Sequence, residues 1–313
     1  MKRKTDNFNK FFNKKSNSAV KEQIKQEKKT AKKERKEAIE RHYEQKRKFK
    51  AEGKPLVKSS KPIAKNQARV DQSLIPLNKY IAHSGVCSRR DAAELIKLGK
   101  AMVNGKVITD PGTRVASTDT VKLNGQKLTV SRNFVYILLN KPKDYITTTE
   151  DPQGRKTVLA LVKTATTERV YPVGRLDRNT SGVLLLTNDG DLAQKLSHPR
   201  PEIKKVYHVV LDKPLIKQDF DKIAAGVQLE DGLATVDAIA YAEANDKTEV
   251  GLEIHSGRNR IVRRIFEHLG YDVRGLDRVV YAGLTKKNVQ RGKWRLLSEK
   301  EVRILKYLNA SIK

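Results

Sequence analysis

The sharpest constraint on folding is a change of composition near residue 70. The first 70 residues hold 24 Lys and Arg side chains against 8 Asp and Glu, a net charge of +16, and few apolar side chains. Such a segment has too little apolar surface to form a packed core alone, although Glu–Lys pairs over residues 21–50 can support a solvated helix. We interpret residues 1–70 as a basic low-complexity tail, disordered or frayed-helical, that either contacts phosphates nonspecifically or only keeps the chain soluble.

The positive net charge of the whole chain indicates what kind of molecule the protein binds. Lys and Arg number 65 against 36 Asp and Glu, and this net charge of +29 favours a nucleic acid as partner. The single cysteine, Cys87, excludes a disulfide framework and a cysteine-based zinc site. The longest apolar run, residues 134–139, is too short to span a membrane, and the first thirty residues show no secretory signal. We therefore predict a cytoplasmic protein that binds RNA or DNA and does not associate with membranes.

Residues 74–131 carry the pattern of a small domain. Apolar residues at helical spacing predict a short helix that ends near Gly85. Ser88 and Asp91 are typical of a capping box that begins a second helix, which ends at Gly99. Asn-Gly pairs between short apolar runs indicate tight hairpins. We expect two helices and a small antiparallel sheet, with strands at residues 102–103, 107–108, 121–123 and 128–130.

This stretch resembles the S4 RNA-binding domain. The resemblance rests on residues 77–82 (LNKYIA), Gly85, residues 88–90 (SRR), Ala92, Ala93 and residues 103–107 (VNGKV). It implies that basic side chains on or beside the two helices hold a folded RNA backbone. An Arg pair at a helix start, taken alone, is more often part of a solvated surface, but the hairpin that follows and the charge balance favour RNA binding here. The candidate RNA-binding residues are Lys79, Arg89, Arg90 and Lys97.

Residues 134–313 form the larger domain. Strands are predicted at residues 135–139, 183–187, 206–211, 234–241, 249–254 and 279–282, and helices at 191–197, 217–225 and 259–269. Strands outnumber helices and do not alternate strictly with them, which disfavours a doubly wound parallel sheet. The predicted fold class is α+β: a small domain of two helices plus a short antiparallel sheet over 74–131, then a mixed, mainly antiparallel-sheet domain over 134–313.

The segment most suggestive of chemistry is residues 172–182 (PVGRLDRNTSG), followed by residues 183–190 (VLLLTNDG). A single carboxylate, Asp177, stands between Arg175 and Arg178 in a loop bracketed by glycines. Flanking guanidinium groups favour the ionised carboxylate. From these residues alone, Asp177 is either a reactive acid or a turn residue paired with Arg175 or Arg178.

This segment resembles the signature of the pseudouridine synthases, and its extension is similar to the RsuA/RluB branch, which modifies ribosomal RNA. Further segments follow in the family's order between residues 74 and 306. The sequence departs from the branch's usual residues at Asp144, Lys204, Ile261, Ile265 and Gly275. The matching segments are residues 140–142 (NKP), 151–155 (DPQGR), 198–199 (HP), 205–207 (KVY), 226–232 (GVQLEDG), 257–260 (GRNR), 262–264 (VRR), 276–278 (LDR) and 292–297 (GKWRLL).

The resemblance implies an isomerase that converts uridine in RNA to pseudouridine, a mixed-sheet catalytic domain and three catalytic residues. Asp177 takes the position of the essential aspartate, which attacks the sugar as a nucleophile or removes a sugar proton as a base. Tyr207 matches the tyrosine that stacks on the uracil and helps take the C5 proton. Arg263 matches the basic residue that pairs with the aspartate. Without the resemblance, Tyr207 is an ordinary strand residue and Arg263 belongs on a solvated helix face.

The resemblance also implies how the substrate is held. The target uridine leaves its stack to reach Asp177, and Arg175 enters the vacated space or holds the flipped nucleotide's phosphate. Leu276 matches an apolar residue that packs against the base; alone, it is a core leucine. Further backbone contacts are expected from Arg178, Arg258 and Arg260.

No cofactor is expected, because the isomerisation involves no redox change and needs no energy input. The six histidines show no metal-ligand spacing, so no metal is expected either. The expected partner of a monomeric chain is ribosomal RNA, with the large-subunit RNA favoured and the small-subunit RNA left open. The S4-like module and the basic tail also fit a rival class, a non-catalytic ribosome assembly factor.

Overall fold

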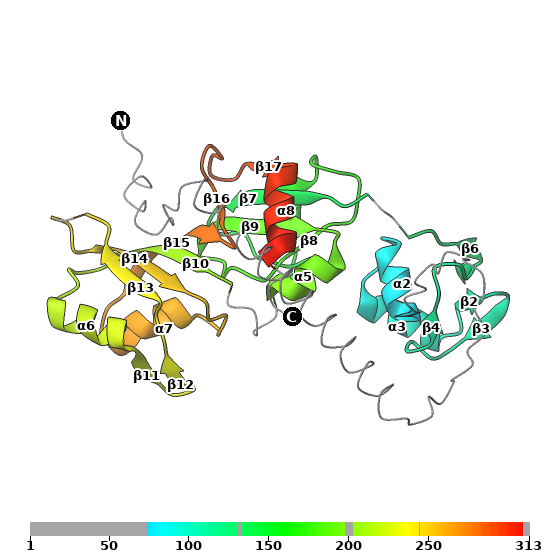
Figure 1. Cartoon of the computed structure of the whole chain (residues 1–313), viewed down its shortest axis with the longest axis horizontal. Helices are drawn as coiled ribbons and strands as arrows, with labels where there is room; N and C mark the ends of the chain where they lie inside the picture. Colours follow the sequence, from blue (N-terminus) through cyan, green and yellow to red (C-terminus); the bar gives the residue numbers. More distant parts are fainter. Residues whose placement is uncertain (1–73, 131–132, 198–202, 244, 309–313) are drawn as a thin grey trace, which may run out of the picture. The chain divides into compact units, whose positions relative to one another are not determined.

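Figure 1 shows the computed structural model, which describes residues 74–130, 133–197, 203–243 and 245–308. The predicted tail over residues 1–70 lies outside the described residues. The described chain holds a small N-terminal set of elements with its own hydrophobic core, followed by a large sheet flanked by helices (Figure 1).

The N-terminal elements confirm the two predicted helices. They are α2 (Leu77–His83) and α3 (Arg89–Lys97), and α3 begins with the expected capping box. Asp91 N donates to Ser88 Oγ at 3.2 Å, and Ser88 N donates to Asp91 Oδ2 at 3.0 Å. The sheet runs in the order β3 (Lys106–Ile108), β2 (Ala101–Val103), β5 (Val121–Leu123), β6 (Gln126–Lys127), and β1 (Ile75–Pro76) pairs separately with β4 (Arg114–Val115).

The two Asn-Gly turns set the register of this small sheet. Asn104 and Gly105 have φ of 51° and 84°, and Asn124 and Gly125 have φ of 50° and 80°. Positive φ at both central residues defines the two-residue turn whose twist matches a hairpin. The last strand was predicted at residues 128–130 but spans Gln126–Lys127, because a two-residue turn lets pairing resume directly after Gly125.

The large sheet confirms the predicted α+β class with mainly antiparallel strands. The neighbours β9 and β15 run parallel, and every other strand pair in this sheet is antiparallel. Two short strands lie off the main path: β8 (Tyr171–Pro172) pairs with β9, and β16 (Leu284–Thr285) pairs with β15. The strand order is β13 (Ala238–Tyr241), β14 (Glu249–Ile254), β10 (Lys205–Leu211), β15 (Val273–Tyr281), β9 (Ser181–Thr187), β7 (Tyr136–Lys141), β17 (Trp294–Leu296).

Both faces of β7 and β9 are buried, which explains their continuous apolar sequence. One face packs against α5 (Gly190–Ser197) and α8 (Glu299–Leu308), and the other against α4 (Val158–Val162). The other half of the sheet packs against α6 (Lys217–Ala225), α7 (Ile261–His268) and the hairpin of β11 (Val227–Leu229) and β12 (Gly232–Ala234). The two halves therefore bury separate apolar clusters on one continuous sheet.

Several elements differ from the sequence predictions. The strand expected over residues 234–241 is divided into β12 and β13, which pair with different neighbours. Strand β15 begins at Val273, six residues before the expected start, because backbone pairing with β10 carries charged positions that break the apolar pattern. Helices α4 and α8 and strand β17 were not predicted.

Candidate active site

The loop that carries Asp177 leads directly into the parallel meeting of β9 and β15. Ser181 pairs with Asp277 and Gly182 with Arg278, while on the far side of β15, Tyr207 of β10 also pairs with Arg278. Three strands thus bring together segments that are far apart in the sequence, and the loop over residues 173–180 lies at their junction.

Gly182 makes this junction possible. Its φ is 111°, and an added Cβ would lie 2.1 Å from the carbonyl oxygen and 2.6 Å from the nitrogen of Arg278. Both atoms belong to the backbone of a core strand and cannot move aside. The glycine of the Thr-Ser-Gly segment is therefore required for the two strands to approach each other.

A fully buried lysine fixes the backbone of the Asp177 loop. Lys141, at the end of β7, has Nζ within hydrogen-bond distance of four carbonyl oxygens: 3.1 Å to Asp177, 3.2 Å to Arg178, 2.8 Å to Thr180 and 3.0 Å to Pro142. Burial lowers the pKa of Lys141 to about 8, and the nearby carboxylates of Asp177 and Asp144 oppose that shift. The ammonium group therefore anchors the Asp177 loop to the end of β7.

A second tie comes from Thr147. Its buried hydroxyl donates to the Leu176 carbonyl at 2.8 Å and lies 3.3 Å from the Leu176 amide. Leu176 itself is buried in the cluster beneath β7 and β9. The residue before Asp177 is thus fixed through both its backbone and its side chain.

The carboxylate of Asp177 is left free. Within the described residues it forms no hydrogen bond or ion pair, and Asp177 is half-buried. Arg178 instead pairs with Asp144 at 3.4 Å, and the Arg175 side chain is exposed with no ion pair in the described part of the chain. The structure does not support the reading of Asp177 as a turn residue paired with either arginine. Asp144 has φ of 69°, which accounts for the glycine usual near this position.

Arg263 approaches the same loop from α7. It is 9% exposed, and its guanidinium donates to Val273 O at 2.8 Å and to Asn179 O, two residues past Asp177, at 3.4 Å. Burial lowers the pKa of Arg263, Arg260 lowers it further, and the Asp177 carboxylate opposes the shift. The expected direct ion pair with Asp177 is absent from the described contacts. Arg263 instead holds the loop backbone and supplies positive charge near the carboxylate.

Tyr207 and Leu276 pack in one apolar cluster beside α7. Tyr207 is 9% exposed and Leu276 is 5% exposed, and both contact the cluster that contains Ile261 and Val262. Leu276 O accepts a hydrogen bond from Ser181 Oγ at 3.3 Å, so the leucine is also tied to the start of β9. The structure thus places Asp177, Tyr207, Arg263 and Leu276 on elements that meet at one end of the β9–β15 crossing.

Arg258 and Arg260, both expected to contact RNA, each form contacts within the protein. Arg258 is engaged with the β11–β12 hairpin, where it bonds the Asp231 carboxylate at 3.1 Å and the Leu233 carbonyl at 2.8 Å. Arg260, at the N-cap of α7 with φ of 46°, pairs with Glu267 at 3.1 Å. The sequence did not reveal these intramolecular contacts, and the RNA contacts expected of Arg258 and Arg260 stay predictions.

The basic residues predicted for the S4 domain also differ in their contacts. Lys79 donates to Asp191 Oδ1 at 2.6 Å and is therefore already paired with a carboxylate. The remaining members of the set are exposed on α3: Arg89, Arg90 and Lys97.

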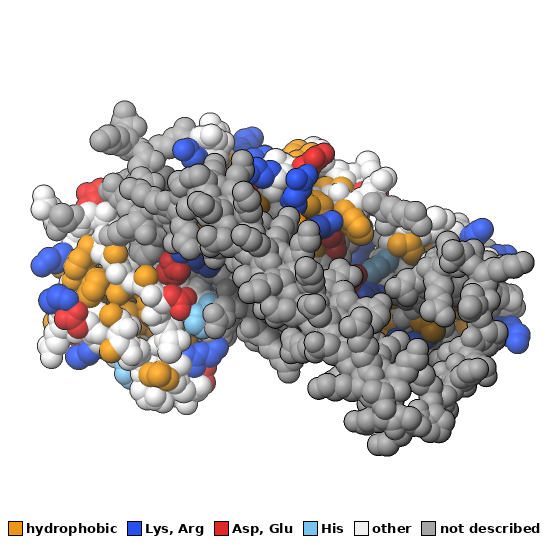
Figure 2. Space-filling model, viewed as in Figure 1, with side chains coloured by type: hydrophobic (Ala, Val, Ile, Leu, Met, Phe, Trp, Pro, Cys, Tyr) orange, Lys and Arg blue, Asp and Glu red, His pale blue; other side chains and the backbone are white. Residues whose placement is uncertain are grey.

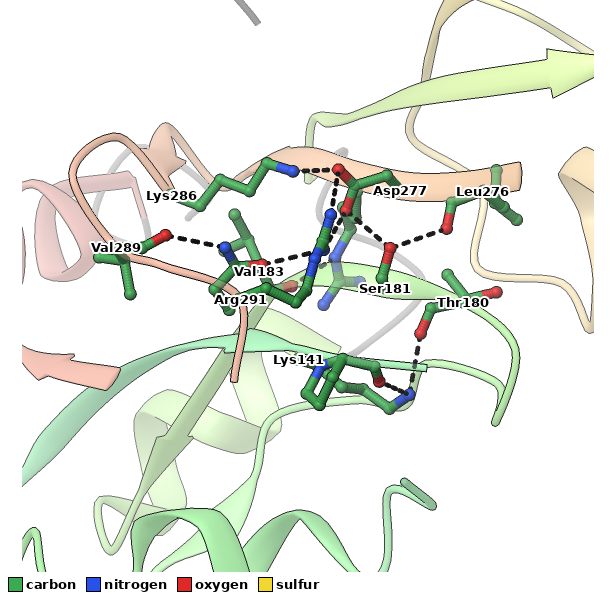
Figure 3. A network of polar contacts seen from close by, with 12 residues as sticks. Lys141, Thr180, Ser181, Val183, Leu276, Asp277, Lys286, Val289 and Arg291 are labelled. Atoms are coloured by element: carbon green, nitrogen blue, oxygen red, sulfur yellow. Dashed lines mark hydrogen bonds and ion pairs between the residues drawn. The ribbon is translucent and has the colours of Figure 1, made fainter. Parts of the chain in front are cut away.

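A polar network behind the site was missed from the sequence (Figure 3). Asp277 accepts from Ser181 Oγ at 3.0 Å, from Arg291 at 2.9 and 3.2 Å, and from Lys286. Arg291 also donates to Asn140 Oδ1 at 3.0 Å. These cations outweigh burial and lower the pKa of Asp277. The network binds the segment after β16 to the β9–β15 crossing, and no spacing in the sequence links its members.

Replacement of Lys141 by methionine should lower the free energy of unfolding by about 1–3 kcal/mol, because buried carbonyl oxygens lose their donor. We also expect the rate of any reaction at the Asp177 loop to fall about 10²-fold as the loop shifts. Chemical denaturation and single-turnover kinetics measure the two effects. Lys143→Met is the control, since exposed Lys143 reaches one carbonyl at 3.5 Å. Equal results for the two variants would show that Lys141 does not fix the loop.

Comparison with known proteins agrees with this arrangement. Residues 135–268 match the family model of RNA pseudouridylate synthases, and residues 75–121 match the S4 domain. Ribosomal large subunit pseudouridine synthase B of Bacillus subtilis is 44% identical over 236 residues, which cover 74% of this chain and 96% of the relative. Dual-specificity RNA pseudouridine synthase RluF of Escherichia coli is 36% identical, covering 74% and 78%. A crystal structure of a pseudouridylate synthase superposes with a TM-score of 0.53 at 26% identity, covering 74% and 99%.

The fold and the site therefore define an RNA-modifying isomerase with a separate RNA-binding module. The chain belongs to the RNA pseudouridine synthases, in the RsuA/RluB-type branch that carries an N-terminal S4 domain. None of the helices in the described ranges is long and apolar enough to cross a membrane. Those ranges also contain no group of three or more His, Cys, Asp or Glu side chains that could hold a metal ion.

Proposed function

We propose that this enzyme converts a specific uridine of ribosomal RNA to pseudouridine, and that its target lies in the large-subunit RNA. The Bacillus subtilis relative is named for the large ribosomal subunit, and its alignment with this chain covers 96% of the relative's length. The Escherichia coli relative is named as dual-specificity, so the branch also contains broader enzymes. The higher identity to the former supports the large-subunit assignment.

The observation that carries the proposed chemistry is the free carboxylate of Asp177 on a loop fixed at three points. Lys141, Thr147 and Arg263 bond the loop backbone without bonding the carboxylate. A group held in place but left unpaired is available to a substrate at little cost of reorganisation. We assign Asp177 as the essential catalytic residue, acting on the sugar as nucleophile or base.

The reaction exchanges one glycosidic bond for another and transfers one proton. The N1–C1′ bond breaks, the uracil turns, C5 bonds to C1′, and the C5 proton leaves while N1 gains one. Tyr207 is assigned to the uracil face and to the C5 proton, and Leu276 to packing against the ring. Arg263 stabilises the ionised Asp177 through its charge. No external oxidant or nucleotide enters this balance.

The uridine must leave its stack to reach Asp177, which lies beside the sheet. Arg175 is exposed two residues before Asp177, and we assign it to the space that the flipped base vacates. Exposed Arg178 is assigned to the adjacent phosphates. The S4 helix α3, with Arg89, Arg90 and Lys97 exposed, supplies further backbone contacts.

A map of pseudouridines in ribosomal RNA from cells with and without the gene tests this function. We expect deletion to remove modification at a defined uridine of the large-subunit RNA and re-expression of the wild-type chain to restore it. Loss from the small-subunit RNA alone would overturn the large-subunit target. An unchanged map would support the rival role in ribosome assembly and contradict the proposed activity.

A further inference from the structure

A hollow lies beside α8, on a part of the catalytic domain to which the proposed chemistry assigns no residue. It is formed where the start of β7 meets α8, and its volume is about 590 Å³. Volumes of ~300–1,000 Å³ are typical of ligand pockets. Three aromatic residues line it: Phe134, Tyr136 and Tyr307.

Two of these aromatic side chains are unusually exposed. Phe134 is 51% exposed and Tyr307 is 67% exposed, whereas Tyr136, which also lines the hollow, is buried. Exposed apolar side chains are usually scattered singly over a protein surface. Two exposed aromatic side chains at the same hollow are instead typical of a binding site. The hollow therefore offers two accessible aromatic rings to a flat partner.

Basic side chains from α8 accompany the rings. Lys306 Nζ lies 5.7 Å from the ring centroids of both Phe134 and Tyr136, and Arg303 also lines the hollow. Neither cation forms an ion pair within the described residues, and both are exposed. Figure 2 shows basic and hydrophobic side chains next to one another over α8.

The nearby carboxylates do not cancel this charge. Arg295 donates to both carboxylate oxygens of Glu301, at 2.8 and 2.6 Å. These hydrogen bonds lower the pKa of Glu301 to about 2. Glu299 is the single acidic residue among those that line the hollow, against two cations. The ligand that matches two aromatic rings and a net positive rim is both flat and anionic.

We propose that this hollow binds an unpaired nucleotide of the RNA substrate, at a position other than the target uridine. The base stacks on Tyr307 and Phe134, and Lys306 and Arg303 hold its phosphate. Stacking of this kind accepts any base, because every base has a π face. The inference rests on the proposed function for the identity of the RNA, and it adds a second point of attachment for single-stranded RNA.

The test compares variants of the full-length protein. Tyr307→Ala should weaken binding of a short single-stranded oligouridylate and of a large-subunit rRNA transcript at least about fivefold, the lower end for loss of one stacked base. Tyr307→Phe should retain wild-type affinity. The matched control is Ile304→Ala, because Ile304 is 47% exposed on the same helix and does not line the hollow. Conversion of the transcript at saturating RNA should stay unchanged in all three variants.

Crosslinking of RNA that contains 4-thiouridine, read by mass spectrometry, supplies an independent measurement. We expect crosslinked peptides that contain Phe134 or residues 299–307, and their loss in Tyr307→Ala. Unchanged affinity together with no crosslink in these peptides would overturn the inference. A change of oligomeric state in Tyr307→Ala, at unchanged RNA affinity, would also overturn it by showing that the hollow binds protein. Loss of conversion at saturating RNA would contradict this inference, whereas failure of the proposed function appears as an unchanged rRNA map.

Discussion

Replacing Asp177 with asparagine should abolish pseudouridine formation while leaving RNA affinity within a few fold. The amide has nearly the same size and no charge, so Lys141, Thr147 and Arg263 still fix the loop through its backbone. The variant lacks the group that we propose acts on the sugar, and removal of a group that acts directly on the reacting atoms costs at least about 10⁴-fold in rate. Single-turnover conversion of an rRNA transcript measures the loss.

The control for this experiment lies in the same region. Asp144→Asn removes an exposed carboxylate that pairs with Arg178 at 3.4 Å, and asparagine tolerates the positive φ of this position. Its conversion rate should stay within about tenfold of wild type, since exposed ion pairs contribute about 0–1 kcal/mol. Substantial turnover by Asp177→Asn would reject Asp177 as the essential residue.

The second large effect is expected from Gly182→Ala. The added methyl group meets backbone atoms of Arg278 at 2.1 and 2.6 Å and Asp277 Oδ1 at 2.6 Å, and the φ of 111° is itself strained for alanine. Strain and overpacking at a core position each cost about 1–3 kcal/mol. We expect the free energy of unfolding to fall by about 2–6 kcal/mol in a urea titration, with loss of activity because β9 and β15 separate below Asp177.

Gly154→Ala separates the two causes. Gly154 has φ of 66° and nothing within 4 Å of an added Cβ, so alanine there meets only the backbone penalty of about 1–2 kcal/mol. If Gly182→Ala cost no more than Gly154→Ala, the close approach of β9 and β15 would not be what requires glycine.

Much of the local structure followed from short-range patterns. The capping box of Ser88 and Asp91 and the two Asn-Gly turns act within a few residues, so the sequence alone could predict them. The buried strands β7 and β9 were also predicted, because their apolar runs are continuous. Strand β15 was largely missed, since its charged positions are stabilised by partners that are distant in the sequence.

The candidate site shows the same division. The sequence picked out Asp177, Tyr207, Arg263 and Leu276 through their resemblance to a family, and all four lie on elements that meet at one end of the β9–β15 crossing. It could not show that Arg263 bonds the loop backbone and not the carboxylate, because that choice depends on how α7 packs on the sheet.

By itself, the sequence determined the high positive charge of residues 1–70, the fold class, the short-range turns and caps, and the resemblance that identified the family. Tertiary structure alone decided which charges remain free. Lys141, Lys286 and Arg291 are indistinguishable from surface residues in the sequence, yet they lie at or beside the site and bond buried acceptors. The physical reason is that a charge withdrawn from water must find its partners across the fold, so its role depends on which strands meet and not on its neighbours in the chain.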